Sequence, residues 1–382
     1  MANNVINVAA LAVLTVSSAA FAQSSVSISG NIDLSYVSAK TADGGKISTV
    51  QNGATSTSKI IFSGVEDLGG GLSAIFRANS TIAADRANTF VRQVNPNMGT
   101  SAAATSATNQ GLAFGDRDLY IGLKGGFGEL RVGRNQSISD DNNNAGGNHG
   151  SVWTYFMANS AAQAGVNNAF GGAAPVLGAA GRINDSFKYA SPVFNGFQVQ
   201  ALYGLGERDN LRSEGVVTEA QVSYVQGPIA VSYSMGKIAA APSDATTFGA
   251  LAASSTQAAL NAAAGVESKE SRLMASYDLG MAKINVGTYN QKTAGAAADK
   301  ASHVTLTMPM DAWTFGATYI TVKDSAPAAG QVAKIDGFSV HAGYALSKRT
   351  RAYAFYRTMD KNGLAAQKAK PSATYIGLNH AF

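Results

Sequence analysis

One pattern dominates this chain: apolar and polar residues alternate in short segments from Val26 to the last residue, Phe382. In the first segment, VSISGNIDLSY from Val26, the even positions carry apolar residues or Gly and the odd positions carry Ser, Asn or Asp. A period of two puts the two sets on opposite faces of a β-strand. The segments begin at Val26, Lys59, Leu72, Asp118, Glu129, Ile183, Phe197, Thr218, Ile229, Ser271, Ala282, His303, Trp313, Gly337, Arg351 and Thr374. Each of these roughly 16 segments has about the length that a tilted strand needs to cross a bilayer.

The polar face distinguishes the chain from a soluble sandwich, whose solvated face is rich in Lys and Glu. Here that face is mainly Ser, Thr, Asn, Gln and Gly, and charged residues make up only 14% of the chain, against a usual ~25%. The apolar face carries aromatic residues near strand ends, as in the two interfacial girdles of an outer-membrane barrel. They are Tyr203, Tyr224, Tyr233, Tyr277, Trp313, Tyr319 and Tyr344. Because open sheet edges cannot lie in lipid, we predict a closed antiparallel transmembrane β-barrel of 16 strands.

The connections between these segments alternate between short turns and long stretches rich in Ala, Asn, Ser, Thr and Gly. Short periplasmic turns and long extracellular loops are typical of such barrels. The long connections are residues 40–57, 80–115, 135–181, 237–269 and 361–372. No linker divides the chain after its N-terminal segment, so residues 23–382 are expected to form one barrel.

The N-terminal segment predicts export. An apolar stretch of signal-peptide length ends in Ala20-Phe21-Ala22, a small-x-small site, so cleavage is expected after Ala22 and residues 1–22 form the signal peptide. The region from Met1 to Asn7 departs from the rule because it has no Lys or Arg. A retained apolar helix or strand is the alternative.

Several classes of site find no support in the residues. The chain has no Cys, which excludes a disulfide framework, thiolate metal sites and a cysteine nucleophile. The net charge of +5 comes without a Lys/Arg run that would indicate nucleic-acid binding. The four His show no ligand spacing, and the run from Asp140 to Asn144 lacks EF-hand spacing, so it is interpreted as a polar turn instead of a Ca²⁺ site. We expect no cofactor, no metal, no catalytic residue and no nucleic-acid partner.

Four stretches resemble a known family. They are STSKIIFSGVEDLGGG from Ser56, DRDLYIGLKGGFGELRVGR from Asp116, SFKYASPVFNGF from Ser186, and the C-terminal strand that ends in Phe382. Their order along the chain is similar to that of the 16-stranded general porins of Gram-negative bacteria, particularly the trimeric porins of beta-proteobacteria. The resemblance extends over the whole mature chain.

The resemblance implies several properties. It implies a homotrimer in the outer membrane, surrounded by outer-membrane lipids, through which small ions and hydrophilic solutes diffuse passively. The terminal Phe382 corresponds to the signal that the outer-membrane insertion machinery recognises. The third long loop, residues 135–181, is expected to fold into the barrel as a constriction.

Charges at such a constriction would act as an electrostatic filter, because low-dielectric walls focus the field. By alternation, the inward-facing cations are Lys59, Arg77, Arg131, Arg182 and Lys188. Lys59, Arg117 and Arg182 match positions of a basic cluster in anion-selective members of the family. Arg117 shares its parity with lipid-facing residues, so we place it at the strand end, above the regular pleat.

The opposing acids are Asp118, which faces inward by parity, and Asp140, Asp141 and Asp185. Asp185 faces outward by simple alternation and needs a late strand start. These charges predict weak anion selectivity; each of them could instead be an ordinary solvated residue of the lumen or of a loop.

Three other functions stay open. A substrate-selective channel would need basic residues for anions or a row of aromatic residues for sugars, and no such row is visible in the sequence. An outer-membrane enzyme would need a Ser–His pair held by a third polar group. An adhesin or receptor would act through the loops and would not exclude a pore.

Overall fold

The computed structural model describes residues 25–40, 44–82, 84, 115–138, 141, 182–205, 216–238, 267–293, 299–323, 334–362 and 370–382. The predicted signal peptide and most of the predicted loop 135–181, including Asp140, lie outside these residues. Among the described residues, no helix is long and apolar enough to cross a membrane.

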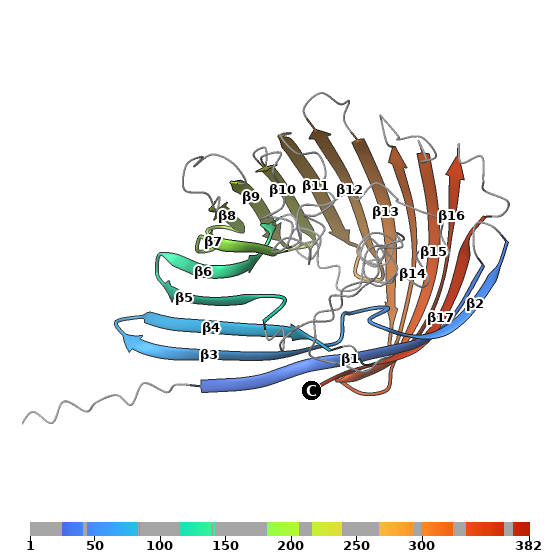
Figure 1. The fold of residues 1–382 in the computed structure, drawn as a ribbon, viewed down its shortest axis with the longest axis horizontal. Coiled ribbons are helices and arrows are strands. Elements are labelled where there is room, and N and C mark those ends of the chain that lie inside the picture. Colours follow the sequence, from blue (N-terminus) through green and yellow to red (C-terminus); the bar gives the residue numbers. More distant parts are fainter. Residues whose placement is uncertain are drawn as a thin grey trace, which may run out of the picture.

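The described residues form one antiparallel sheet of 17 strands that closes on itself (Figure 1). From β3 onwards each strand pairs with the next along the chain, β1 pairs with both β2 and β3, and β17 returns to pair with β1. The strands are β1 (Ser25–Lys40), β2 (Lys46–Asn52), β3 (Lys59–Gly69), β4 (Leu72–Thr81), β5 (Leu119–Gly125), β6 (Gly128–Gln136), β7 (Arg182–Ala190), β8 (Phe197–Gly204), β9 (Val217–Gln226), β10 (Ile229–Ile238), β11 (Ser268–Asp278), β12 (Lys283–Thr293), β13 (Asp299–Met310), β14 (Trp313–Lys323), β15 (Lys334–Ala345), β16 (Thr350–Asn362) and β17 (Ser372–Ala381).

The first strand accounts for the difference between 17 strands and 16 positions in the ring. The second half of β1 pairs with β2, and its first half pairs with β3, so β2 and β3 share one position. Residues 40–57, predicted to be a loop, therefore contain a strand. Alternation does not reveal β2, because its outward residues, Lys46, Ser48 and Val50, do not form an apolar face.

The buried carboxylate of Asp33 fixes the segment that connects β2 to β3, residues 53–58. Asp33 is fully buried, and its Oδ2 accepts hydrogen bonds from the backbone N–H groups of Thr55 (2.9 Å) and Ser56 (2.7 Å) and from Asn379 Nδ2 (3.1 Å). The hydroxyl groups of Thr55 and Tyr353 donate to the same carboxylate. Donors from this connecting segment, from β16 and from β17 thus satisfy the hydrogen-bonding capacity of the buried Asp33 carboxylate.

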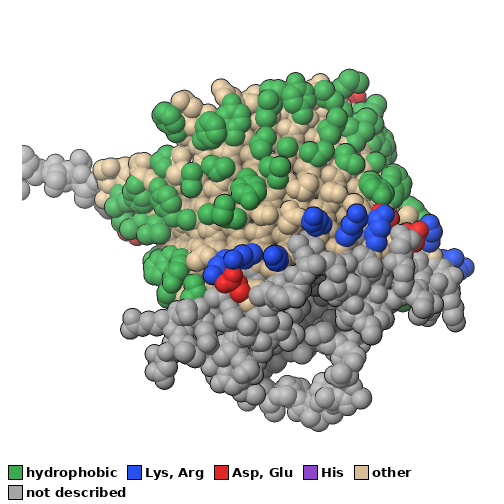
Figure 2. Space-filling view, turned by 90° about the horizontal axis from the view of Figure 1, so that it is seen from above, with side chains coloured by type: hydrophobic (Ala, Val, Ile, Leu, Met, Phe, Trp, Pro, Cys, Tyr) green, Lys and Arg blue, Asp and Glu red, His purple; other side chains and the backbone are tan. Residues whose placement is uncertain are grey.

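The distribution of side chains is that of a barrel in lipid, not of a soluble protein. In β1, Asn31, Asp33 and Ser35 are buried, whereas Val26 and Ile28 are exposed by 70% and 60%. Apolar side chains form a broad band on the outer surface (Figure 2). The alternation predicted from the sequence is confirmed, and the apolar set faces outward.

The aromatic residues lie on the outer face, five of the seven predicted ones near a strand end and Tyr233 and Tyr319 nearer the middle of β10 and β14. Trp313 packs against Tyr344 with ring centroids 4.8 Å apart, and Phe197 against Tyr224 at 4.6 Å, both pairs beside short turns. The other predicted girdle tyrosines, Tyr203, Tyr233, Tyr277 and Tyr319, are exposed large side chains as well.

The seam between the first and last strands is closed by backbone hydrogen bonds. Gly30 N–H donates to the Phe382 carbonyl and Phe382 N–H donates to the Gly30 carbonyl, each at 3.1 Å. A Cβ on Gly30 would lie 2.7 Å from the Phe382 ring and 2.3 Å from the Lys59 carbonyl oxygen. The terminal residue therefore lies directly on the first strand, and only glycine fits beneath its ring.

Candidate functional site

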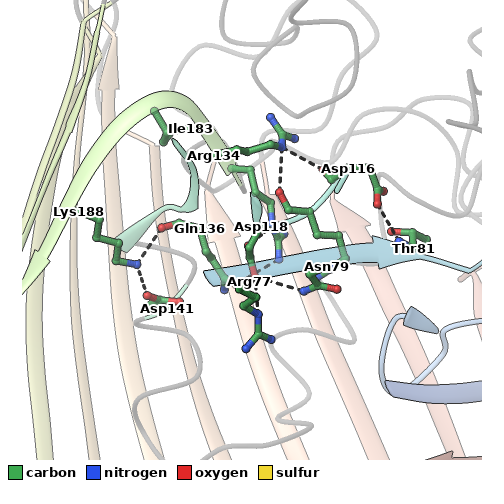
Figure 3. Close-up of polar contacts among 12 residues, drawn as sticks. Arg77, Asn79, Thr81, Asp116, Asp118, Arg134, Gln136, Asp141, Ile183 and Lys188 are labelled. Atoms are coloured by element: carbon green, nitrogen blue, oxygen red, sulfur yellow. Dashed lines mark hydrogen bonds and ion pairs between the residues drawn. The ribbon is translucent and has the colours of Figure 1, made fainter. Parts of the chain in front are cut away.

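A cluster of charged side chains lines the inner wall where β4 ends and β5 and β7 begin (Figure 3). At its centre is the buried carboxylate of Asp118, which directly precedes β5. Arg182 Nε lies 3.2 Å from its Oδ1, and Arg77 Nε lies 3.6 Å from its Oδ2. Asn79 Nδ2 donates to Oδ2 at 3.2 Å. One carboxylate thus holds two guanidinium groups from different strands.

Strand register places these residues on one face. Arg77 pairs with Tyr120, the next inward position after Asp118, and Arg182 pairs with Gln136 at the end of β6. Because side chains alternate strictly in a strand, partners across a ladder face the same side. The inward predictions for Arg77 and Arg182 agree with this register, and the contacts of Asp118 with both side chains bring its carboxylate to the same side.

Lys59 and Arg117 complete the cluster. Lys59 pairs with the buried Asn31 and so faces inward. Arg117 belongs to residues 115–118, which lie outside β5, so strand parity does not govern its direction. Its backbone N–H donates to the Asn79 carbonyl at 3.1 Å, and its charge acts on both Lys59 and Asp118.

The cations determine the charge state of Asp118, which lies outside the strands. Burial alone would raise the pKa of Asp118. Arg182 and Arg117, the hydrogen bond from Asn79, and Arg77 together outweigh burial, so the pKa lies below its ordinary value of 3.8. Asp118 therefore stays ionised at neutral pH beside an excess of positive charge.

The segment before β5 is held by two other polar residues. Asp116 Oδ1 accepts a hydrogen bond from Thr81 N–H at 2.7 Å. Arg134 Nε donates to the carbonyl oxygens of Arg117 (2.9 Å) and Asp116 (3.1 Å). These contacts fix the backbone from which Arg117 and Asp118 extend.

A second charged pair lies beside the cluster, at the start of the predicted constriction loop. The ammonium group of Lys188 in β7 pairs with the Asp141 carboxylate and donates to the Gln136 carbonyl at 2.8 Å. Ile138 N–H donates to Glu219 Oε2 of β9 at 2.6 Å. The first residues after β6 are thereby tied to β7 and β9, which directs this segment along the inner wall.

Two predicted residues lie apart from the cluster. Arg131 faces inward, but it pairs with Glu129 of its own strand and lies over the Tyr120 ring, 4.7 Å from the centroid. Asp185 is exposed and has a φ of 45°, in an irregular part of the β6–β7 ladder opposite Gly133 and Asn135. Among the described residues, Asp185 forms no ion pair. Asp140 lies outside the described part of the chain.

Four charged residues of the site were missed from the sequence, Asp116, Glu129, Arg134 and Glu219, and so was the amide donor Asn79. Glu129 and Glu219 occupy inward positions of their predicted segments, so parity could have found both. Arg134 follows the irregularity at Gly133, where alternation fails.

Comparison with known proteins decides the family. The model of the family described as Gram-negative porin matches residues 8–364. The chain belongs to this porin family. It is an outer-membrane β-barrel.

Individual porins are similar to the chain in sequence or in structure. The chain is 29% identical over 284 residues to outer membrane porin protein 32 of Delftia acidovorans, a match that covers 72% of the chain and just under two thirds (66%) of that protein. The anion-selective porin from Comamonas acidovorans has the same fold, with a TM-score of 0.65 and 21% identity over 94% of this chain and 100% of that chain. The trimer form of OmpT from Vibrio cholerae also matches, with a TM-score of 0.57 and 17% identity over 94% and 99% of the two chains.

Proposed function

We propose that this porin forms a water-filled channel through which ions and small hydrophilic solutes diffuse passively, with weak selectivity for anions. The observation that carries the proposal is the composition of the inner-wall cluster: Lys59, Arg77, Arg117 and Arg182 act on a single carboxylate, Asp118. Fixed charge of one sign on a low-dielectric wall concentrates ions of the opposite sign. The description of the Comamonas porin as anion-selective supports the same sign here.

The Lys188–Asp141 pair supports a narrow passage. It ties the start of the predicted constriction loop, residues 135–181, to the inner wall beside the cluster. We propose that this loop, Asp140 included, narrows the channel and brings its charges opposite the basic wall. Arg131 is assigned to the lumen beside the constriction, because it pairs with Glu129 and not with the cluster, and Asp185 is assigned no part in the filter.

The assembly is also a proposal. A homotrimer is supported by the trimer form of the OmpT structure. Export through a signal peptide cleaved after Ala22, and insertion by machinery that recognises Phe382, follow from the sequence. We assign no cofactor, metal or catalytic residue.

An aromatic row on the inner wall raises the question of a sugar channel. Phe355 stacks on Tyr375 with centroids 4.0 Å apart, Tyr353 stacks on Phe355 at 6.2 Å, and Arg357 lies over Tyr375. The three rings are exposed by only 7%, 1% and 6%, for Phe355, Tyr375 and Tyr353. A sugar-binding row must present open ring faces to the solute, so these rings favour a packing role and not a sugar path.

The test is planar-bilayer recording of the purified protein in a KCl gradient. Stepwise conductance is expected, with steps in groups of three for a trimer, and a reversal potential of the sign that chloride preference gives. A reversal potential that reports potassium preference would refute the selectivity. A conductance that saturates with one solute would indicate a substrate-selective channel.

A further inference from the structure

Three apolar side chains form a small patch on the inner wall where β7 begins, β8 ends and β9 begins. Ile183, Leu202 and Val217 are exposed by only 5%, 3% and 4%. Further along the inward faces of β8 and β9 lie amides and a hydroxyl, those of Gln198, Gln200, Gln221 and Ser223. In a water-filled channel such an apolar patch is stabilised when another apolar group covers it.

Ile138, the second residue after β6, is the group that covers this patch. Its side chain is fully buried and packs with Ile183, Leu202 and Val217, which we call the apolar socket, in one cluster. A Cβ on Gly204 of β8 would lie 2.5 Å from Ile183 Cγ2 and 3.3 Å from Val217 Cβ. The absence of a side chain at this position of β8 therefore makes room for the cluster.

Polar contacts fix the backbone on both sides of the Ile138 side chain. Asn135 Nδ2 donates to the carbonyl and hydroxyl oxygens of Ser186, both at 3.1 Å. Ile138 N–H donates to Glu219 Oε2 at 2.6 Å. Water can take the place of such a donor or acceptor, whereas withdrawal of Ile138 would expose both its side chain and the apolar socket. Unlike the hydrogen bonds, the apolar contact therefore has no substitute in water.

This anchor fixes an acid of the proposed filter. Asp141 N–H donates to the Ser137 carbonyl at 3.1 Å, which is the hydrogen bond of a helical turn. Residues three apart in such a turn face the same side, so Ile138 and Asp141 both face the wall. The wall offers matching neighbours, because Leu202 of the apolar socket pairs directly with Lys188. Lys188 is the cation that holds the Asp141 carboxylate (Figure 3).

We infer that Ile138 is a positioning residue of the channel, whose place in the apolar socket holds the Asp141 carboxylate against Lys188. The inference rests on the proposed function, because Asp141 influences permeation only if the charges of this wall filter ions. With the pair intact, Asp141 offsets the charge of Lys188 beside the basic cluster. When Ile138 leaves the apolar socket, Asp141 separates from the wall and Lys188 adds its full charge to the cluster.

The first measurement reads the anchor itself and does not depend on ion selectivity. Amide hydrogen exchange, followed by mass spectrometry, is compared for peptides that span residues 136–141 of the full mature protein in detergent. I138A should raise exchange there by about tenfold or more, because truncation of the buried side chain weakens the anchor, and I138V should stay near wild type. The matched control I320A makes the same truncation at a buried isoleucine of β14, which is 2% exposed.

The second measurement reads the charge that Ile138 positions, as the reversal potential in a KCl gradient at a mean of 0.1 M. D141N should raise the chloride-to-potassium permeability ratio by about threefold, because Lys188 loses its compensating charge. I138A should raise the ratio by about twofold, and I138A/D141N should match D141N, since both substitutions remove the same compensation. A merely structural defect would not depend on whether residue 141 is charged, and I320A should leave the ratio unchanged.

A heat-dependent gel shift confirms that each barrel is folded. G204A narrows the apolar socket without changing Ile138, so it should show the same two effects and takes the place of I138A if that variant does not fold. Exchange in I138A and G204A equal to that in I320A would overturn the inference, and so would effects of I138A and D141N that multiply in the double variant. If D141N leaves the wild-type ratio unchanged, the proposed filter fails, and the exchange result alone decides whether Ile138 is the anchor.

Discussion

The double variant R77Q/R182Q tests the electrostatic filter most directly. It removes the two guanidinium groups that contact Asp118, at 3.6 Å and 3.2 Å, and keeps side chains that can still donate hydrogen bonds to the carboxylate. The cluster would then retain Lys59 and Arg117 against one acid, so its net charge falls from three positive to one.

The size of the effect follows from Coulomb's law. A permeating ion about 7 Å from one charge in water gains or loses ~0.6 kcal/mol, and screening at 0.1 M salt reduces this to ~0.3 kcal/mol. Two charges change the energy of an anion and of a cation by ~0.6 kcal/mol each, in opposite directions. The chloride-to-potassium permeability ratio should therefore fall by about eightfold at 0.1 M, but only by about 1.5-fold at 1 M, where the Debye length is ~3 Å.

The assay is the reversal potential in KCl gradients at the two mean salt concentrations. The control K348Q/R349Q removes two charges from an exposed short turn between β15 and β16 and should leave the ratio unchanged. The reasoning is refuted if the double variant keeps the wild-type ratio at 0.1 M, or if its effect is as large at 1 M as at 0.1 M.

Three further predictions concern single residues. D118N should raise the chloride-to-potassium ratio by about threefold at 0.1 M, because it removes the one acid of the cluster; a lower ratio in reversal-potential measurements would contradict this. D33A should destabilise the barrel by on the order of 3–5 kcal/mol, since five donors lose an ionised acceptor, and the heat-dependent gel shift should occur at a lower temperature than in wild type. G30V should reduce the folded fraction on refolding, because its side chain would collide with the Phe382 ring; wild-type yield would show that the seam can open to admit it.

The alternation of residues determined the faces of this protein without any tertiary information. Parity is a local property of an extended chain, since successive side chains point to opposite sides whatever the partner strand is. For that reason the sequence predicted the outward apolar band and the inward positions of Arg77, Asp118 and Lys188. Turn and loop lengths likewise indicated which strand ends lie together.

Contacts between strands could be decided only by the tertiary structure. Alternation fails at Gly133, where the β6–β7 ladder shifts its register and leaves Asp185 away from the cluster, and in the turn that carries Arg117. Strand β2 exists because the end of β1 supplies a partner, not because its own residues form an apolar face. Arg182 meets Asp118 for the same reason, because register is set by hydrogen bonds to strands distant in sequence and no local pattern records it.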